Sequence, residues 1–419
     1  MTLTNWAGNI SFGAARFHQP QSMEQLQEIV GHSARCRVLG TGHSFNRLAD
    51  TNDDLVSLRA LPSRIVIDPS AETVTVGAGT SYGDLADELH RSGLALHNLG
   101  SLPHISVGGA CTTGTHGSGN SNGNLATAVR AVELLTASGE VLTLDRTANA
   151  KVFPGAVISL GSLGVVTALT LDVQPTYEVS QTVYEDLEFG PALDDLDNIL
   201  ASGYSVSIFT LWDRPVFEQV WVKGRVNPLL STVAPSVLAG ASAATRQRHP
   251  LPEISGEVCT TQLGVVGPWH QRLPHFRLDF TPSAGEELQS EYFVDRAFAV
   301  PALRALDELR ALMSPHLLVS ELRTVAADDL WLSPAFGHHC LAIHFTWKPD
   351  AAAIAPVLRR IEECLSAFSA RPHWGKVFDF DPAYIVAQYP HIADATALAI
   401  HYDPTAKFEN EFTRTYLRR

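Results

Sequence analysis

The chain reads GTGHSFN at residues 40–46, directly after the short apolar stretch RCRVL at residues 35–39. The apolar stretch predicts a short buried strand, and the glycines predict a tight turn that lets a ligand approach the backbone closely. Successive small residues in such a turn can aim their N–H groups at one point and form a nest for an anion. The hydroxyls of Thr41 and Ser44 add donors, but anion binding leaves His43, in the middle of the turn, unexplained.

A second glycine-rich loop, GGACTTGTHGSG at residues 108–119, has the same character. Neither loop matches a nucleotide motif. The first ends in Phe45 where a dinucleotide fingerprint has glycine, and no acidic residue follows on a strand to bind a ribose. The second lacks the Lys-Ser/Thr pair of a P-loop. Two such loops, with LGSLGVVT at residues 160–167, favour a phosphate-bearing ligand; tight turns without a ligand are the alternative.

Composition and charge narrow the class of protein. The 419 residues are 45% hydrophobic and 18% charged, which is typical of a globular protein with two or three domains. The net charge of −14 argues against a nucleic-acid partner. The N-terminal residues 1–17 do not resemble a secretory signal. The most apolar segment, residues 228–244, is too short to span a membrane, so we expect a loop with a packed helical piece there and no membrane partner.

The cysteines indicate the cellular compartment. They are widely spaced and form no CxxC pair: Cys36, Cys111, Cys259, Cys340 and Cys364. This favours reduced thiols in a cytoplasmic protein over a disulfide or zinc framework. Cys111 lies in the second glycine-rich loop, where we expect it to be a small packed residue.

The pattern of apolar residues changes near Pro175 and predicts an α+β chain. Before this point, helical periodicity occurs at residues 21–30 and 82–96, and strand patterns occur at residues 64–79, 129–144 and 161–175. After it, alternating polar and apolar residues are typical of half-buried antiparallel strands. These strands are expected at residues 205–212, 217–224, 287–294, 318–327 and 341–347, with helices at residues 300–313 and 351–368.

Several of these segments resemble the FAD domain of the vanillyl-alcohol oxidase superfamily. They are RVLGTGHSF (37–45), ETVTVGAGTSYGDLADEL (72–89), GLALHNLGSLPHISVGGACTTGTHGSG (93–119) and LGSLGVVTALTLDVQP (160–175). Later segments are similar to the alditol (xylitol) oxidases of that superfamily, with aldonolactone oxidases as wider relatives. They are ELQSEYF (287–293), ELRTVAADDLWLSPAFG (321–337), HFTW (344–347), RPHWGKVF (371–378) and DPTAKFENEF (403–412).

The resemblance implies a three-part organisation. Residues 1–175 would form a two-subdomain FAD-binding domain of the vanillyl-alcohol oxidase type. Residues 176–375 would form an α+β substrate (cap) domain with a large antiparallel sheet, and residues 376–419 would pack back on the FAD domain.

The resemblance also implies FAD attached covalently through His43. A neutral imidazole is a good nucleophile near neutral pH, which suits this role. Gly100 would lie beside the flavin and leave room for oxygen. His97, His104 and His116 could suggest a metal, but no carboxylate or cysteine completes a site, so none is expected. The residues that the resemblance implies for FAD binding are Gly40, Thr41, Gly42, His43, Ser44, Phe45, Ser101, Ser106, Gly109, Thr113, Gly114, Thr115, His116, Gly164, Val166 and His373.

Strand periodicity brings polar residues of the later segments together in pairs. Glu321 and Arg323 share a face, as do His344 and Thr346, and Gln289 and Glu291. If these strands are neighbours, one sheet face presents all of these groups, with Lys376 nearby. A solvated face with ordinary ion pairs is the alternative. The resemblance instead implies a polyol-binding site made by Ser101, Gln289, Glu321, Arg323, His344, Thr346 and Lys376.

Roles follow from what an alcohol oxidase must do. Hydride leaves most easily when the oxygen carries negative charge, so we expect Arg323 and Lys376 to contact the reacting hydroxyl. Glu321 would anchor Arg323 and accept a hydrogen bond from a substrate hydroxyl, and these three residues form the expected catalytic set. Gln289, His344, Thr346 and Ser101 would hold further hydroxyls or the flavin edge, and His373 would touch the flavin.

The sequence therefore predicts an FAD-dependent oxidase. It would convert the terminal primary alcohol of a small alditol, such as xylitol or sorbitol, to the aldose, with hydride transfer to flavin N5 and O2 reduced to H2O2. One alternative is an aldonolactone oxidase or a carrier-linked dehydrogenase of the same fold. The other is a carbohydrate-binding protein without redox activity. A monomer or small homo-oligomer is expected, with residues 228–250 as a lid or a contact surface.

Overall fold

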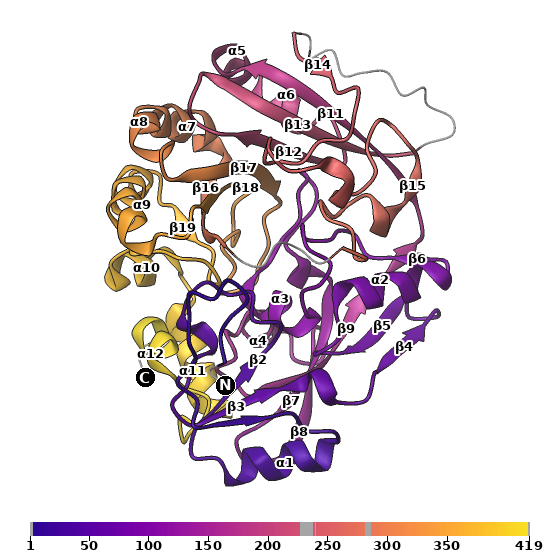
Figure 1. Ribbon diagram of the computed structural model, residues 1–419. Coiled ribbons are helices and arrows are strands. Elements are labelled where there is room, and N and C mark those ends of the chain that lie inside the picture. The colour runs from indigo at the N-terminus through magenta and orange to yellow at the C-terminus, as the bar shows by residue number, and fades with distance from the viewer. Residues whose placement is uncertain (1–2, 227–237, 239, 281–285, 418–419) are drawn as a thin grey trace.

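The computed structural model describes residues 3–226, 238, 240–280 and 286–417. Its first part contains a parallel sheet, an antiparallel sheet and the short antiparallel pair of β6 at Leu94–Ala95 with β10 at Gln174–Pro175 (Figure 1). A parallel sheet has the order β1–β3–β2, with β1 at Arg16–His18, β3 at Asp54–Ser57 and β2 at Cys36–Leu39. An antiparallel sheet has the order β4–β5–β9–β7–β8, with β4 at Ile65–Asp68, β5 at Thr73–Gly77, β9 at Val165–Asp172, β7 at Val129–Leu135 and β8 at Val141–Asp145. The predicted strand, strand pair and hairpin of this part are confirmed.

The two predicted helices of the first part are also confirmed. Helix α1 spans Met23–His32, and the Ser22 hydroxyl caps it by accepting from the Gln25 N–H. Helix α2 spans Tyr82–Arg91 and ends before Gly93, which has φ of +74°. The second glycine-rich loop predicted at residues 108–119 differs, because its first half belongs to the short helix α3 at Val107–Thr113. That helix brings the second glycine-rich segment against the end of β5.

A large antiparallel sheet dominates the second part, as the sequence predicts. Its strands run in the order β14–β11–β13–β12–β17–β18–β16–β19, with β15 paired to β11. Their bounds are β11 Glu178–Glu188, β12 Ser205–Thr210, β13 Val216–Arg225, β14 Ser242–Ala243, β15 Gly267–Pro268, β16 Leu288–Asp295, β17 Leu317–Val325, β18 Cys340–Trp347 and β19 Arg371–Pro372. The fold is therefore α+β, with the architecture expected.

Helices cover the side of this sheet that faces away from the first part (Figure 1). They are α5 Phe189–Asp194, α6 Leu196–Leu200, α7 Ala299–Asp307, α8 Arg310–Met313 and α9 Ala351–Ser366. The single helix predicted over residues 300–313 is divided into α7 and α8, because Leu309 donates to the Leu306 carbonyl in a tighter turn. The prediction of half-buried strands was wrong for the central strands: every residue of β12 and β18 is buried, since both faces are covered.

The last segment returns to the first part of the chain. It contains α10 at Pro382–Gln388, α11 at Ile392–Tyr402 and α12 at Glu411–Leu417. The Cys36 N–H donates to the Lys407 carbonyl over 2.8 Å, and Asn410 Nδ2 donates to the Leu48 carbonyl over 2.9 Å. The packing places these helices beside β2, immediately before the His43 turn. The boundaries of the three-part division stay a prediction.

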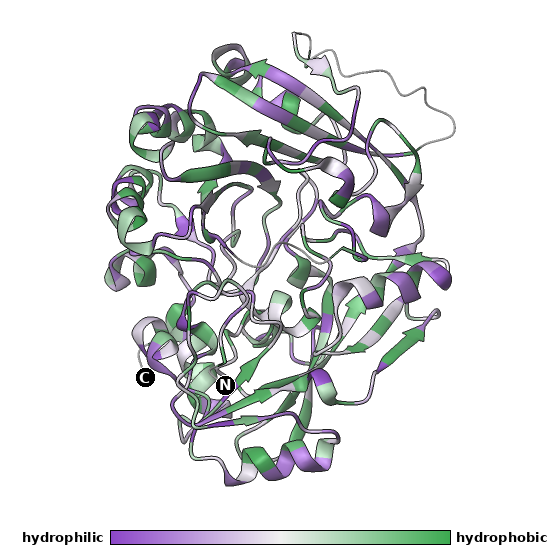
Figure 2. Ribbon diagram, viewed as in Figure 1, coloured by the Kyte–Doolittle hydropathy of each residue, from purple (hydrophilic) through white to green (hydrophobic). Residues whose placement is uncertain are grey.

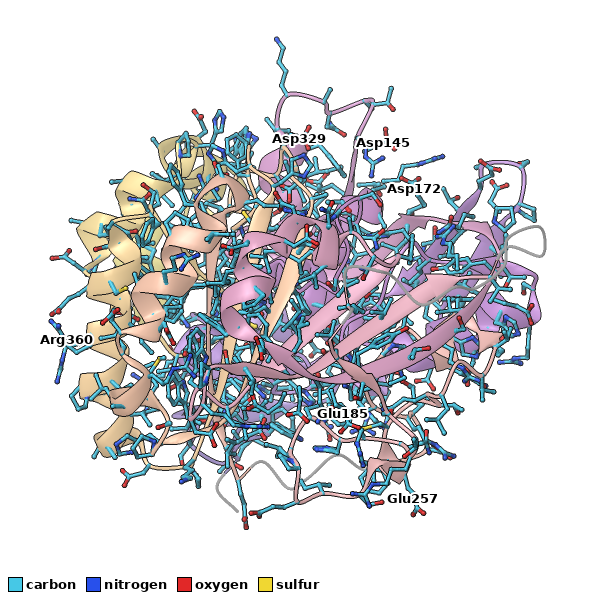
Figure 3. The ribbon with its side chains drawn as sticks, turned by 90° about the horizontal axis from the view of Figure 1, so that it is seen from above. Asp145, Asp172, Glu185, Glu257, Asp329 and Arg360 are labelled. Carbon is cyan, nitrogen blue, oxygen red and sulfur yellow. The ribbon has the colours of Figure 1, made fainter. Side chains whose placement is uncertain are left out.

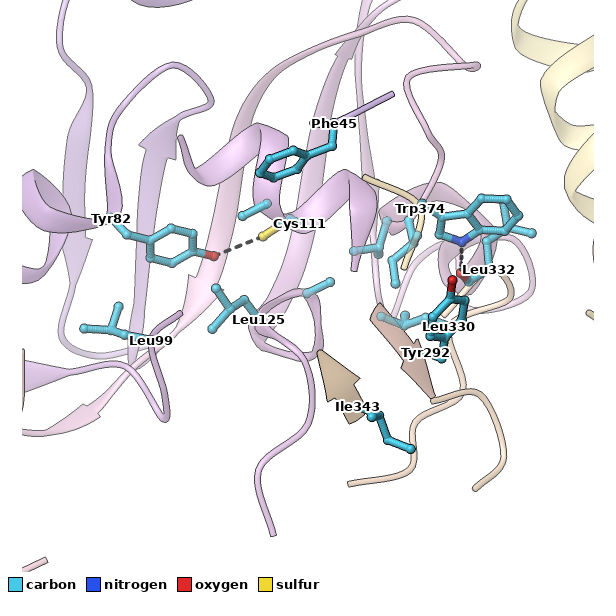
Figure 4. Close-up of a cluster of buried hydrophobic side chains, with 14 of the residues drawn as sticks. Phe45, Tyr82, Leu99, Cys111, Leu125, Tyr292, Leu330, Leu332, Ile343 and Trp374 are labelled. Carbon is cyan, nitrogen blue, oxygen red and sulfur yellow. Dashed lines mark hydrogen bonds between the residues drawn. The ribbon is translucent and has the colours of Figure 1, made fainter. Parts of the chain in front are cut away.

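Hydrophobic residues run along β2, β4 and β5, whereas α1 and the outer strands of the large sheet carry hydrophilic and hydrophobic residues side by side (Figure 2). The labelled charged side chains of Glu257 and Arg360 lie at the periphery (Figure 3). In the core, the Cys111 sulfur lies 3.3 Å from the Tyr82 hydroxyl, so this cysteine is the packed residue expected (Figure 4). No helix among the described residues is long and apolar enough to cross a bilayer. The loop predicted at residues 228–244 falls largely outside the described ranges.

Candidate active site

A cavity of about 1660 Å³ lies where the first part of the chain meets the large sheet. The His43 turn and the second glycine-rich segment line one side, and the polar residues of β16, β17 and β18 line the other. All predicted substrate-binding residues, together with Gly100, reach its wall. So do all predicted FAD-binding residues except Gly114, which ends α3 with φ of +73° and lies against Pro334 instead.

The His43 turn is held from both sides. It follows β2 directly, and Gly42 has φ of +74°, a conformation that favours glycine. Asn5 Nδ2 donates to the Ser44 carbonyl over 2.9 Å, and the Phe45 N–H donates to the Gly375 carbonyl over 2.8 Å. A Cβ on Gly40 would lie 2.7 Å from the Ser106 hydroxyl, so a close approach between the two glycine-rich segments requires glycine there.

His43 is a half-buried, uncharged imidazole. Its Nδ1 lies 3.0 Å from the Thr41 hydroxyl, and its ring stacks on Trp6 with centroids 5.1 Å apart. Burial, with the nearby Lys376 ammonium, lowers the pKa of His43 to about 4. Its Nε2 is buried and has no hydrogen-bond partner among the described residues. A neutral ring with an unsatisfied nitrogen at a cavity wall is suited to bonding a group held in that cavity.

The second glycine-rich segment packs more tightly than an open anion nest. The N–H groups of Val107 and Gly108 donate to the carbonyls of Thr80 and Ala78 over 2.9 Å each, so neither is available to a phosphate. A Cβ on Gly108 would lie 2.7 Å from the Ala78 Cβ and 2.9 Å from its carbonyl oxygen. The Ser106 side chain caps no N–H group of α3. It instead faces Gly40 and lines the cavity.

Three adjacent strands bring the predicted polar pairs into register. Gln289 of β16 pairs with Thr346 of β18. In the next row, Glu291 of β16 and Glu321 of β17 both pair with His344 of β18. The strands are neighbours, and the shared face lines the cavity. One sheet face therefore presents all of these polar groups to the cavity, as predicted for neighbouring strands.

Glu291 is the centre of the charged network on this face. Its Oε1 accepts from Arg323 Nη2 over 3.0 Å and lies 3.1 Å from His116 Nε2. Burial opposes its ionisation, but electrostatic attraction to His116 and His344, together with the hydrogen bond to His116, holds the pKa of Glu291 well below its usual value. Sequence reasoning placed Glu291 on the correct face and gave it no role. The same period-two signal that selected Gln289 could have selected it.

Arg323 connects the two sides of the cavity. Its Nη1 donates to the Ser101 hydroxyl over 3.1 Å. Its Nε lies 3.5 Å from Glu321 Oε1, a longer contact than the 3.0 Å hydrogen bond to Glu291. Glu291, more than Glu321, therefore anchors the guanidinium. Neighbouring carboxylates outweigh burial and raise the pKa of Arg323, so the group is a fixed cation.

Lys376 lies on a segment that follows the edge of β16. The His373 N–H donates to the Glu291 carbonyl over 2.9 Å, and the Val377 N–H donates to the Gln289 carbonyl over 2.8 Å. The Lys376 ammonium donates to Gln289 Oε1 and lies 4.9 Å from the centre of the Phe45 ring. Burial lowers the pKa of Lys376 to about 8 and that of His373 to about 3.

His275 and Glu287 are site residues that sequence reasoning missed. His275 Nε2 lies 2.7 Å from Glu321 Oε1, and Glu287 Oε1 accepts from Gln289 Nε2. Both residues line the cavity. His275 comes from an irregular segment in which no periodicity marks it. Across the described ranges, no group of three or more His, Cys, Asp or Glu residues is arranged to hold a metal ion.

The chain is similar to several known proteins. Residues 14–145 match the FAD binding domain family, and residues 286–416 match the D-arabinono-1,4-lactone oxidase family. The alditol oxidase of a Streptomyces species is 50% identical over 99% of both chains. The L-gulonolactone oxidase of Bos taurus is 28% identical over 97% of this chain and 96% of its own. A solvent-stable cholesterol oxidase shares the fold, with a TM-score of 0.80 at 14% identity over 99% of this chain and 97% of that one.

Proposed function

The chain belongs to the FAD-dependent alditol oxidase family, and from that premise we propose that it oxidises the terminal primary alcohol of a small alditol to the aldose, with O2 reduced to H2O2. Xylitol and sorbitol are the expected type of substrate. The observation that carries this proposal is the buried polar face of β16, β17 and β18. With Lys376 beside it, this face presents two cations, carboxylates, an amide and a hydroxyl to one cavity, a set suited to a ligand hydroxylated along its length.

The cavity fits FAD in three respects. Its volume of about 1660 Å³ exceeds that of ordinary small-ligand pockets and leaves space for a cofactor and a substrate together. Gly40 allows the two glycine-rich segments to approach each other at the wall. The buried Nε2 of His43 lacks a partner in the described part of the chain, which supports covalent attachment through that ring. The glycine-rich segments, Gly164, Val166 and His373 would hold the cofactor.

Bound flavin supplies the hydride acceptor and passes the electrons to O2. The chain's own residues prepare the alcohol for that transfer. The Arg323 guanidinium and the Lys376 ammonium would both donate to the reacting hydroxyl oxygen and stabilise it as it loses its proton. Glu321 would accept a hydrogen bond from a neighbouring hydroxyl. Gln289, Thr346, His344 and Ser101 would orient the rest of the polyol.

A panel of xylitol, sorbitol, glycerol and gulonolactone, assayed for peroxide, tests the proposal. Turnover of the alditols with H2O2 release is expected. Preference for gulonolactone would favour the lactone-oxidising relatives, and turnover only with an artificial acceptor under anaerobic conditions would indicate a carrier-linked dehydrogenase. A colourless protein that takes up no FAD would contradict the enzyme assignment altogether.

Two further features belong to the same proposal. Gly100 lines the cavity and would leave the flavin accessible to oxygen. All five cysteines are free thiols, which supports a reducing compartment, and we infer a cytoplasmic protein. Gel filtration at assay concentration distinguishes a monomer from a small homo-oligomer.

A further inference from the structure

Lys223, in the middle of the large sheet, is a fully buried lysine outside the cavity lining. It lies on β13, and its Nζ makes three contacts. It donates to the carbonyls of Leu273 and Pro274, the latter over 3.2 Å, and lies 3.1 Å from His275 Nδ1. An ammonium has three donors and no acceptor, so these partners match its full capacity. Burying an ammonium is costly, and burial lowers the pKa of Lys223 to about 7, so its presence here calls for an explanation.

The contacts fix the tautomer of His275 from both ends. Its Nε2 lies 2.7 Å from Glu321 Oε1, and a carboxylate can only accept. Nε2 must therefore carry the proton, and Nδ1 must accept from Lys223. Burial and the Lys223 charge lower the pKa of His275 to about 4, so the ring is neutral. A neutral imidazole with both nitrogens engaged is held in one orientation.

The contact with His275 also determines which oxygen of Glu321 is left for a ligand. Oε1 of Glu321 accepts from His275 Nε2 over 2.7 Å and lies 3.5 Å from Arg323 Nε, which makes an ion pair with it and no hydrogen bond. Glu321 lines the cavity, and the contacts that its carboxylate makes with these two described residues fall on Oε1. Oε2 therefore keeps its accepting capacity for a group inside the cavity.

The backbone around His275 reaches the opposite wall. The N–H groups of His275 and Phe276 donate to the Ser101 carbonyl over 3.1 and 3.2 Å. The Thr260 hydroxyl donates to the Pro274 carbonyl over 2.6 Å, beside the Lys223 contact. One short segment thus connects the cofactor side of the cavity, at Ser101, to Glu321 on the substrate side.

We propose that Lys223 and His275 are positioning residues for Glu321. Lys223 holds His275 as the Nε2–H tautomer, and His275 holds the carboxylate so that Oε2 faces the substrate. The role of Glu321 toward a polyol hydroxyl rests on the proposed function. The hydrogen-bonded chain from Lys223 through His275 to Glu321 does not. An experiment can therefore contradict the hydrogen-bonded chain without contradicting the proposed function, and the reverse.

Nitrogen chemical shifts test the chain without any turnover. In protein labelled with ¹⁵N-histidine, His275, assigned by its absence from His275→Gln, should show a protonated Nε2 and an acceptor Nδ1. In Lys223→Met, the Nδ1 resonance should move toward that of a free pyridine-type nitrogen. A wild-type His275 with its proton on Nδ1, or a Nδ1 shift unaffected by Lys223→Met, would overturn the proposal. The chemical-shift test gives its answer even if the protein oxidises no polyol.

A pair of variants tests the consequence for Glu321. The amide nitrogen of His275→Gln can replace Nε2–H, whereas that of His275→Asn reaches only the Nδ1 position. His275→Asn should lower kcat/KM for xylitol about tenfold or more, the range for a lost hydrogen bond to a charged group, while His275→Gln retains most of it. Both variants keep Lys223, so the comparison holds if Lys223→Met does not fold.

A double-mutant cycle separates positioning from general stability. In a Glu321→Gln background, Lys223→Met and His275→Asn should change kcat/KM less than about twofold, because coupled residues are non-additive. Lys407→Met is the matched control: Lys407 is also buried and donates to a carbonyl, that of Val30, and neither residue lines the cavity. Its kcat/KM per folded molecule should stay at the wild-type value. Equal activity of the two His275 variants, or additive effects with Glu321→Gln, would overturn the positioning role.

Discussion

The N–H of Phe45 donates to the carbonyl of Gly375 over 2.8 Å and joins the turn that carries His43 to the segment that carries Lys376. Asn46 strengthens this junction, because its Nδ2 donates to the carbonyls of both Trp374 and Lys376 over 2.8 Å. The residue expected to bond the flavin and a cation expected to activate the alcohol therefore share one rigid frame. Preorganisation of this kind lets an enzyme stabilise developing charge without rearranging at the moment of reaction.

Replacement of His43 should release the cofactor. In His43→Ala, any bound FAD should become extractable by acid precipitation, whereas the colour should remain with the pellet of the wild-type chain. His32→Ala is the control, since His32 is exposed near the end of α1 and contacts the Glu28 carbonyl. A His43→Ala pellet that keeps its colour would place the covalent bond on another residue.

Loss of the Lys376 charge should reduce turnover strongly. Lys376→Met keeps the length of the side chain and removes the ammonium, so kcat/KM for xylitol should fall by about 10²–10³, the effect of deleting one oxyanion donor. Lys348→Met is the control, because Lys348 is exposed and donates to the Pro315 carbonyl. Full turnover by Lys376→Met would remove this residue from the mechanism.

The activity should decline on the alkaline side of neutrality. Burial lowers the pKa of Lys376 to about 8. The ammonium is present below that pH and lost above it, so kcat/KM should fall as pH rises through about 8. In Lys376→Arg, whose guanidinium stays charged, this decline should move to higher pH even if the rate is lower. An unchanged alkaline limb in Lys376→Arg would assign the titration to another group.

The sequence predicted most of the regular strands and helices, and it predicted which polar side chains of the candidate site share a sheet face. Strand periodicity assigned Glu321, Arg323, His344 and Gln289 to their faces, because side-chain direction alternates along any strand. Which strands are neighbours is a long-range property that periodicity leaves open. Resemblance provided that step here, and the order β17–β18–β16 bears it out.

What the sequence left undetermined has a common physical cause. His275 is brought to Glu321 by an irregular segment whose course depends on contacts with Ser101 and Lys223. The second glycine-rich segment suggested an open anion nest, yet two of its N–H groups are satisfied by the carbonyls of Thr80 and Ala78. The hydrogen-bond partners of such backbone groups come from distant parts of the chain, and no local sequence pattern identifies them.

Close packing of α3 against the end of β5 should make Gly108 intolerant of a side chain. Gly108→Ala would bring its Cβ within 2.7 Å of the Ala78 Cβ and 2.9 Å of the Ala78 carbonyl oxygen. The backbone at Ala78 could move away only at a substantial cost in free energy. We expect a loss of about 1–3 kcal/mol in the free energy of unfolding, as for other overpacked sites, together with lower FAD content.

Gly31→Ala is the matched control for Gly108→Ala. Gly31 lies in α1, and no atom lies within 4 Å of the position that an alanine Cβ would occupy there. Alanine at this site should stabilise the protein by up to about 1 kcal/mol, through helix propensity. Thermal unfolding of both variants, with the flavin content measured by absorbance, checks the pair. Equal melting temperatures would contradict the packing argument.

Gly100 offers a test of oxygen access that should leave the fold intact. A Cβ at this position would meet Ile105 Cδ1 at 3.6 Å and Thr115 Cγ2 at 3.7 Å, which are ordinary van der Waals contacts. Gly100→Ala should therefore fold and bind FAD as the wild type does.

If the space beside Gly100 admits O2, reoxidation of the xylitol-reduced enzyme should slow in Gly100→Ala and more so in Gly100→Val. The anaerobic reduction by xylitol should stay close to the wild-type rate in Gly100→Ala, because no substrate contact is removed. Stopped-flow absorbance measures the two half-reactions separately. Equal slowing of both would indicate a distorted cavity, and unchanged reoxidation would show that oxygen enters by another route.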